Sequence, residues 1–331
     1  MAVDAPTERF FSCRCRCSCR SSILRFYLSA GRRFSMRRLA SGYRRHIGLL
    51  YRGGIVDVAF KPIPEPRIVF EGGGIIVVAK PAGMHCAPTG SPEGDAAGDP
   101  STLCAWLFGL RPTAAAIRGR GKGEGGLLHR LDAPTSGLVA FASDEDAFAA
   151  VIAAAGAGKF VKRYRALGVP VGSGLLGSKP ESIAPAGVDA STWSRCLRGS
   201  DLRRISDMLS GTAVESRFRP YGPGAARVAC SSPDSTPSGG GKAWTRDAYR
   251  SDIAEARPYK DGVLAEIELS RGFRHQVRAH MAWLGLPLEG DRTYGDGEPG
   301  ELRLRAYRLS FPAPRGGGTI VVDLDDNDIG A

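Results

Sequence analysis

HRLDAPTSGL, residues 129–138, places His129, Arg130 and Asp132 directly before a polar turn and a short apolar run. Charged residues are common in turns, so Asp132 fits a residue that merely opens a loop. A carboxylate beside basic neighbours also fits a catalytic group. These ten residues leave both interpretations open, and the sequence on either side decides between them.

Apolar periodicity on both sides of this stretch predicts short strands mixed with helices. IVFEGGGIIVVAK, residues 68–80, holds two β-branched runs separated by glycines, which predicts a β-hairpin. We expect a helix capped by Ser143, strands over 162–171 and 263–270, and a helical period over 271–286. Because strands and helices do not strictly alternate, the pattern favours an α+β fold.

The first sixty residues differ in composition from the rest of the chain. They hold 12 arginines, no lysine and three acidic residues, so they carry +9 of the net charge of +11. Such a segment is compatible with a transit peptide, a disordered basic arm, or a start codon placed upstream of Met36. We expect residues 1–60 to lie outside the fold. Residues 61–331 then form the main domain. It has variable insertions near 172–210, which is weakly patterned, and near 222–242, where glycine, proline and serine predict a loop.

The charge and the cysteines bound the class of protein. A net charge of +11 suggests a polyanionic partner. Four of the eight cysteines alternate over positions 13–19, unlike the paired spacing of a zinc site, and the other four are scattered, as in a reducing cytoplasm. No apolar run approaches the roughly 20 residues of a membrane-spanning helix. We therefore expect a cytoplasmic protein without a membrane partner, with organelle targeting by the first segment left open.

Four motifs together resemble those of the RluA-like pseudouridine synthases, which isomerise uridine in ribosomal or transfer RNA. HRLDAPTSGL resembles the HRLD-x-x-TSGL motif, and IIVVAKPAGM (75–84) resembles the earlier strand with its KPAG turn. FVKRYRAL (160–167) resembles the lysine-tyrosine strand, and RGFRHQVRAHMAWLGLPLEGDRTYG (271–295) resembles the HQ-[IL]-R-x-H…GD-x-x-YG motif. They occur in the family's order. The resemblance implies the pseudouridine synthase fold, a mixed and mainly antiparallel sheet flanked by helices and loops around a basic cleft.

The reaction of that family explains the residue types. Pseudouridylation cuts a carbon–nitrogen glycosidic bond, turns the uracil, and rejoins it through carbon 5. The resemblance implies that Asp132 is the catalytic carboxylate, either as the nucleophile or by stabilising charge at the sugar. It implies that Tyr164 gives an aromatic face to the flipped base and that its hydroxyl helps to remove the carbon-5 proton. No metal or redox cofactor is required, and we expect none.

One motif departs from the family pattern. The family usually reads Gly-Arg-Thr-His-Gln where residues 272–276 read Gly-Phe-Arg-His-Gln, so Phe273 stands at the arginine position. The family's arginine pairs with the catalytic aspartate. Our hypothesis is that Arg274 takes over this pairing as a third catalytic residue, and Arg271 and Arg278 are the alternatives.

Further residues of the motifs are expected to bind substrate or RNA. Arg130 suits an RNA phosphate, although it and its neighbour His129 also fit a role in supporting the loop. Two residues of the last motif either touch RNA or orient the loop, namely Gln276 and Arg278. The remaining polar residues of that motif are expected to pack or to close a turn: His275, His280, Asp291 and Tyr294.

These observations predict an RNA pseudouridine synthase, which we weighed against two other classes. A protein kinase is excluded because GKGEGG (121–126) and HRLD are separated by only two residues, without a strand lysine between them. A catalytically impaired RNA-binding protein with the same fold stays open because of Phe273. The expected partner is ribosomal or transfer RNA, and the expected state is a monomer without a metal.

Overall fold

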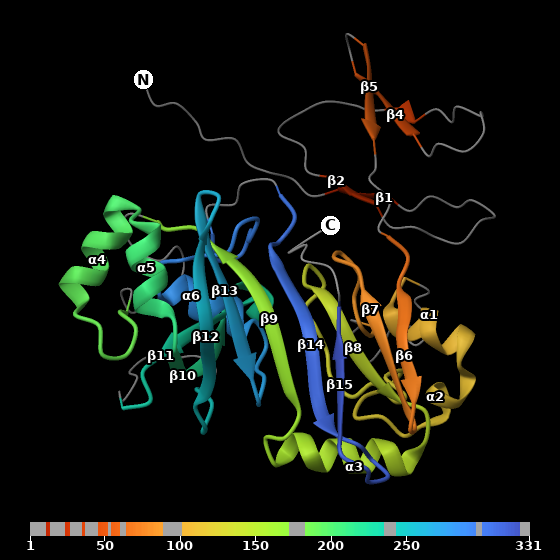
Figure 1. Ribbon diagram of the computed structural model, residues 1–331. Coiled ribbons are helices and arrows are strands. Elements are labelled where there is room, and N and C mark those ends of the chain that lie inside the picture. The colour runs from red at the N-terminus through yellow and green to blue at the C-terminus, as the bar shows by residue number, and fades with distance from the viewer. Residues whose placement is uncertain are drawn as a thin grey trace. The chain divides into compact units, whose positions relative to one another are not determined.

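The computed structural model describes residues 64–88, 101–171, 183–234, 243–295 and 300–324, together with short strands between residues 11 and 59 (Figure 1). The chain separates into two compact units, Met1–Pro62 and Ile63–Ala331. The first unit contains two small antiparallel sheets, one of two strands and one of three. Their strands are β1 (Phe11–Cys13), β2 (Leu24–Phe26), β3 (Ser35–Met36), β4 (His46–Tyr51) and β5 (Gly54–Ala59). That residues 1–60 lie outside the catalytic fold stays a prediction.

The second unit is built on a sheet of ten strands. Their order is β11-β10-β12-β13-β9-β14-β8-β7-β6, and β15 pairs with β14. Every pairing in this sheet is antiparallel except the parallel contact of β14 with β8. The strands are β6 (Arg67–Gly72), β7 (Ile75–Lys80), β8 (Ser136–Ala142), β9 (Val161–Gly168), β10 (Thr212–Tyr221), β11 (Arg227–Ser231), β12 (Tyr249–Tyr259), β13 (Gly262–Leu269), β14 (Leu304–Pro312) and β15 (Thr319–Asp323). The predicted mixed, mainly antiparallel sheet is confirmed.

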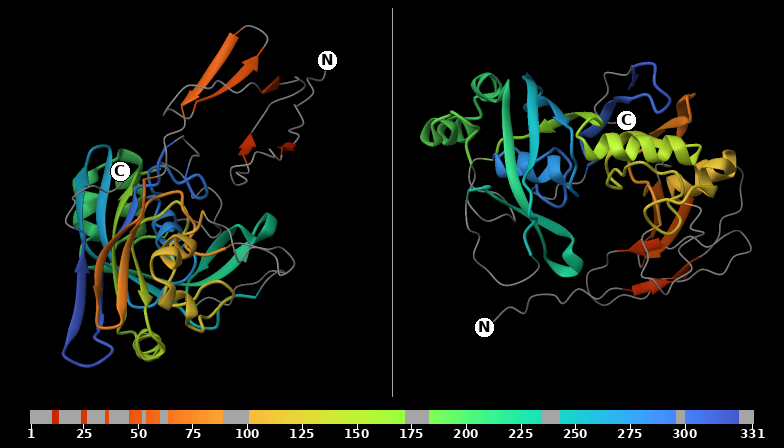
Figure 2. Two further views of the ribbon diagram at one scale, coloured as in Figure 1. Left: turned by 90° about the vertical axis from the view of Figure 1, so that its right-hand side faces the viewer. Right: turned by 90° about the horizontal axis from the view of Figure 1, so that it is seen from below.

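Helices cover the sheet at both of its ends and on both of its faces. They are α1 (Leu103–Leu110), α2 (Pro112–Ala116), α3 (Glu145–Gly156), α4 (Ala190–Gly199), α5 (Leu202–Leu209) and α6 (Gln276–Trp283), with a 3₁₀ turn η2 at Pro223–Ala225. The pair α4–α5 lies near the β10 end of the sheet and the pair α1–α2 near the β7 end (Figures 1 and 2). Helices and strands are thus mixed without strict alternation, which confirms the α+β fold class.

The sequence of β7 shows why the middle of the sheet is buried on both faces. Ile76 and Val78 belong to the core cluster that includes α1 and α6, whereas Ile75 and Val77 belong to the cluster that includes α3. Side chains alternate between the two faces of a strand, so a continuous apolar run fills both cores. The hairpin of β6 and β7 is confirmed, with β7 ending at Lys80.

A glycine fixes where β8 meets β14. Gly137 has a φ of +121°, and a Cβ atom there would lie 2.2 Å from the carbonyl oxygen of Ala306. Only glycine combines that backbone conformation with so close an approach of two chains. The glycine of the TSGL motif therefore anchors the segment that carries Asp132 to the centre of the sheet.

Three expectations about local structure need correction. The cap of α3 is Asp144 and not Ser143, because the Asp144 side chain accepts the Ala147 N–H at 2.9 Å. Residues 222–242, expected as loop, include the strand β11, which pairs with β10. Residues 172–210, expected to be weakly patterned, include the amphipathic helices α4 and α5 with their apolar sides buried. Among the described residues, no helix has the length and apolarity that crossing a membrane requires.

Candidate active site

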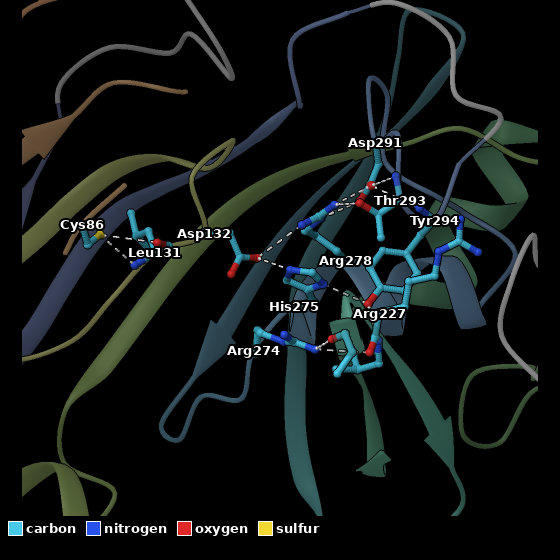
Figure 3. Close-up of polar contacts among 12 residues, drawn as sticks. Cys86, Leu131, Asp132, Arg227, Arg274, His275, Arg278, Asp291, Thr293 and Tyr294 are labelled. Carbon is cyan, nitrogen blue, oxygen red and sulfur yellow. Dashed lines mark hydrogen bonds and ion pairs between the residues drawn. The ribbon is translucent and has the colours of Figure 1, made fainter. Parts of the chain in front are cut away.

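Asp132 lies on the loop that leads into β8, where its backbone and its side chain make separate contacts. Its backbone carbonyl accepts the Thr135 N–H at 3.0 Å, which closes the polar turn. Its side chain, 23% exposed, projects toward the start of α6 (Figure 3). There Oδ2 lies 3.5 Å from Arg278 Nη1 and 3.8 Å from His275 Nε2. The carboxylate therefore faces two nitrogen donors from a distant part of the chain.

A small pocket joins Asp132 to the strand that carries Tyr164. Arg130, Asp132, Tyr164, Phe273 and Arg278 are among its lining residues. The Tyr164 side chain is buried on β9, and burial raises the pKa of its hydroxyl well above the usual range. The structure thus brings together the two residues that the resemblance implied as carboxylate and aromatic face. Their catalytic roles stay predictions.

Arg278 is fixed by the last motif before it reaches Asp132. Its Nε and Nη2 donate to the two oxygens of Asp291, both at 2.7 Å, and Nη2 also donates to Thr293 Oγ1 at 2.7 Å. Burial would lower the pKa of Arg278, but the hydrogen bonds and charge of Asp291 raise it. A bidentate pair of this kind holds the guanidinium plane rigidly. Nη1 is then the nitrogen directed at Asp132.

The hypothesis that Arg274 pairs with Asp132 is wrong. The Arg274 Nη2 donates to the carbonyl oxygen of Ala225 and, at 3.2 Å, to that of Arg227. Its guanidinium therefore grips the turn between β10 and β11, away from the carboxylate (Figure 3). The arginine beside Asp132 is Arg278, one of the alternatives.

Arg274 and Arg278 lie on either side of His275. His275 has a φ of +59° and a ψ of +16°, a left-handed conformation at the residue that precedes α6. Arg274, before it, contacts the β10–β11 turn. Arg278, in the first turn of α6, faces Asp132. Phe273 packs against the rings of Phe218 and Tyr249, with centroids 4.9 and 5.1 Å away.

Most polar groups of Gln276 and Arg278 are engaged by contacts within the protein. The Gln276 Oε1 accepts the Phe273 N–H at 2.9 Å, and its Nε2 donates to the carbonyl of Arg250 at 2.9 Å. The side chain is buried, as is Arg278. These contacts fit the alternative that the two residues orient the loop, and RNA binding by them stays a prediction.

His129 and Arg130 differ in their exposure to solvent. His129 is buried: its Nε2 accepts the Ala140 N–H at 3.2 Å, and its ring lies 5.1 Å from that of Phe160. Burial lowers the pKa of His129 well below its usual value, so the ring is neutral. These contacts fit a role in supporting the loop, and RNA binding by His129 stays a prediction. Arg130 is 66% exposed beside Glu124, so its predicted contact with RNA phosphate stays a prediction.

Two residues of the site were missed from the sequence. The Lys80 Nζ donates to three carbonyl oxygens, those of Pro81, Met84 and Ala133, at 2.9, 2.9 and 3.1 Å. Burial lowers the pKa of Lys80 to about 8. A lysine that ends a fully apolar strand, as in IIVVAK, is the pattern that could have indicated a buried structural role.

The second missed residue is Cys86, which holds the other side of the loop. Its Sγ accepts the Leu131 N–H at 3.3 Å and lies 3.4 Å from the Leu131 carbonyl oxygen. Leu131 and Ala133 are the neighbours of Asp132, so the turn after β7 grips the chain on both sides of the carboxylate. Among the described residues, no group of three or more His, Cys, Asp or Glu side chains is placed to hold a metal ion.

Comparison with known proteins finds relatives that are all named pseudouridine or pseudouridylate synthases. The family model for RNA pseudouridylate synthase matches residues 74–283. The chain is 27% identical over 234 residues to the uncharacterized RNA pseudouridine synthase YhcT of Bacillus subtilis, which covers 70% of this chain. It is 27% identical over 246 residues to the ribosomal large subunit pseudouridine synthase D of Zymomonas mobilis, which covers 71%.

The matched parts are not whole proteins. The chain spans 59% of the length of the Bacillus relative and 60% of the Zymomonas relative. The solved structure of human RNA pseudouridylate synthase domain containing 1 has 20% sequence identity, covers 81% of this chain and 86% of its own, and gives a TM-score of 0.46. Because the family match spans most of the chain and includes three of the motifs and the fourth up to the end of α6, the chain belongs to the RNA pseudouridylate synthase family, among its RluA-like members.

Proposed function

We propose that this protein isomerises specific uridines of structured RNA to pseudouridine, with Asp132 as the catalytic carboxylate. The observation that carries the proposal is the pocket that Asp132 and Tyr164 both line. Arg278, itself fixed by Asp291, lies against one oxygen of that carboxylate. The pocket thus combines a carboxylate, an aromatic ring and an arginine, which are the groups that the reaction uses.

The reaction breaks the bond between C1′ and N1 of the nucleotide and forms a bond between C1′ and C5. A proton leaves C5 and N1 gains one. The target base must leave its stack to reach a recessed carboxylate, at a cost of a few kcal/mol. Attack on the sugar and stabilisation of charge there both need a carboxylate oxygen directed at the substrate. Arg278 and His275 both approach Oδ2, so Oδ1 is the oxygen that we assign to the substrate.

Tyr164 is assigned a narrower role than the sequence suggested. A buried phenol with a raised pKa keeps its proton at neutral pH and is a weak base. Its ring, however, lines the pocket beside Asp132. We therefore propose that Tyr164 stacks against the flipped uracil, and that it does not remove the C5 proton as a phenolate.

Ribosomal RNA is the substrate class that we favour over transfer RNA. The relatives from Zymomonas mobilis and Pseudomonas aeruginosa are named ribosomal large subunit pseudouridine synthase D. The exposed Arg130 at the pocket is placed to meet a phosphate next to the target nucleotide. The alternative of an RNA-binding protein without catalysis depended on a missing arginine. Because Arg278 lies beside Asp132, that reason no longer holds.

Two measurements test the proposal. The first is tritium release from ribosomal and transfer RNA transcripts labelled at carbon 5 of uridine, with the Asp132→Asn variant as the control. The second maps pseudouridine in RNA from a deletion strain and its parent. We expect release from ribosomal RNA only, and the loss of specific sites in the deletion strain. Release that is equal for the wild-type protein and the variant would refute a catalytic role of Asp132.

A further inference from the structure

His275 stands out among the described residues because its backbone is strained at the pocket. Four described residues other than glycine have a positive φ: Ser200, Ala225, Lys260 and His275. The first three lie at a helix end or in turns, whereas His275 lines the pocket with Asp132. A left-handed conformation is unfavourable for a residue other than glycine. Such a cost persists where the surrounding contacts fix the residue in place.

The contacts of the imidazole assign its tautomer. The Tyr294 Oη accepts the Val228 N–H at 2.8 Å and lies 3.0 Å from His275 Nδ1. The hydroxyl proton needs an acceptor, and among the described residues the only acceptor within reach of Oη is Nδ1. Burial raises the pKa of Tyr294, so the phenol keeps that proton. Nδ1 is then the acceptor, and the ring proton lies on Nε2.

His275 Nε2 faces the reacting carboxylate. It lies 3.8 Å from Asp132 Oδ2, the same oxygen that Arg278 Nη1 approaches at 3.5 Å (Figure 3). Distances of this kind are longer than formed hydrogen bonds, as is common for catalytic groups before substrate binds. Burial lowers the pKa of His275 to about 4, so it offers a neutral N–H rather than a second positive charge. A neutral donor orients a carboxylate with less effect on its charge than a second cation would have.

We propose that His275 is a positioning residue that donates from Nε2 to Asp132 Oδ2, with Tyr294 fixing its tautomer, and so directs Oδ1 at the target nucleotide. This role rests on the proposed isomerase function. It differs from the sequence expectation, in which His275 and Tyr294 only pack or close a turn. The Val228 N–H, the Tyr294 hydroxyl, the His275 imidazole and the Asp132 carboxylate follow one another in a single line of contacts.

The test is the His275→Gly variant with added imidazole. Glycine accepts a φ of +59° without strain, so the backbone is retained and an opening is left at the pocket. We expect kcat to fall about 10- to 100-fold with little change in KM for RNA, as for other residues that orient a catalytic group. Imidazole in the buffer should restore part of the lost kcat. Lys260→Gly, at a left-handed position in the β12–β13 turn, is the matched control and should have unchanged kcat.

Each outcome decides the proposal. An unchanged kcat in His275→Gly, or a lowered kcat that imidazole does not raise, would refute the positioning role while leaving the isomerase function standing. If the wild-type protein releases no tritium, the function fails, and the ¹⁵N shifts of the His275 ring decide the remaining claim. A proton on Nε2 that moves in Tyr294→Phe supports the assigned contacts, and a proton on Nδ1 contradicts them.

Discussion

Two segments meet at the carboxylate, and they are held in place in different ways. The Asp132 segment, residues 127–135, is gripped from outside: Lys80 and Cys86 bind the backbone on both sides of the aspartate. The α6 segment, residues 270–278, is held by its own side chains, through Gln276 to the Phe273 N–H and Arg274 to the β10–β11 turn. The first segment is held by the turn that follows β7, and the second by its own side chains and by the left-handed conformation of His275.

The difference has a consequence for chemistry. Backbone contacts place Asp132 while leaving its side chain free to meet the substrate. In the α6 segment, side chains such as Gln276 and Arg274 hold the backbone in place. The groups of this segment that lie near the carboxylate are Arg278 Nη1 and His275 Nε2. Substitutions in the two segments should therefore fail differently, one in chemistry alone and the other in chemistry together with stability.

The largest expected effect is that of Asp132→Asn on turnover. The amide is nearly the same size but is neither anionic nor nucleophilic, so we expect turnover to fall at least about 10³-fold. RNA affinity and the midpoint of thermal unfolding should stay close to wild type, because the segment is held by its backbone. Tritium release, RNA binding and thermal unfolding measure the three effects. Asp323→Asn, in the β14–β15 hairpin, is a control that should be fully active.

A second prediction separates the two arginines of the α6 segment. Arg278→Ala leaves Asp291 buried without its partner, so we expect a loss of about 3–5 kcal/mol in the free energy of unfolding and a large fall in turnover. Arg274→Ala removes exposed hydrogen bonds to two carbonyls and should cost about 1 kcal/mol. Urea unfolding and single-turnover rates compare them. If the Arg274 variant were the more damaged of the two, the contacts assigned to each arginine would be wrong.

The same comparison shows which features were predictable from the sequence. The motif resemblance and the apolar periods were sufficient to place Asp132 before β8, Tyr164 on β9, and both at one site. The partner of Asp132 was not predictable in this way. A left-handed φ at His275 could not be read from the sequence, nor could the contacts that hold Arg274 at the β10–β11 turn and Arg278 at Asp291.

Other misses have equally local causes. Ser143 and Asp144 are both good helix caps, and only the backbone shows that Asp144 accepts the N–H of Ala147. The strand β11 is short, lies at the edge of the sheet and is flanked by glycine, proline and serine, so its sequence favours loop. Lys80 was part of a quoted motif, but its role depends on carbonyls that only the folded turn brings together.

A third prediction tests the external grip on the Asp132 segment. Lys80→Met keeps the length of the side chain but loses three hydrogen bonds to carbonyl oxygens. We expect a loss of about 2–3 kcal/mol in the free energy of unfolding. Each hydrogen bond with a charged group is worth about 1.5–3 kcal/mol, and the cost of burying the ammonium group offsets much of the sum of the three. The value of kcat should fall about 10-fold with KM for RNA unchanged, because Ala133 beside Asp132 is released. A changed KM with a normal kcat would show that Lys80 serves RNA binding instead.

The smallest expected effect concerns acid pH and helix α6. His280 is buried between the hydroxyls of Ser216 and Ser251, at 2.8 and 2.9 Å, and burial lowers its pKa to about 3. In the unfolded chain the same histidine takes up a proton near pH 6.5. The unfolded state therefore binds more protons between these values. The stability that the neutral ring contributes is complete above about pH 6.5 and is lost progressively as the pH falls toward about 3.

At about pH 5 this loss amounts to about 2 kcal/mol for His280 alone. Gln in its place can still bond both serines but cannot take up a proton. His280→Gln should therefore lose about 2 kcal/mol less than wild type between about pH 7.5 and about pH 5, which urea unfolding at the two pH values measures. An equal loss in both proteins would mean that protonation of His280 does not destabilise the fold. The loss of stability in acid would then come from other groups. The neutral His280 ring would not be what stabilises the packing of α6 against the sheet.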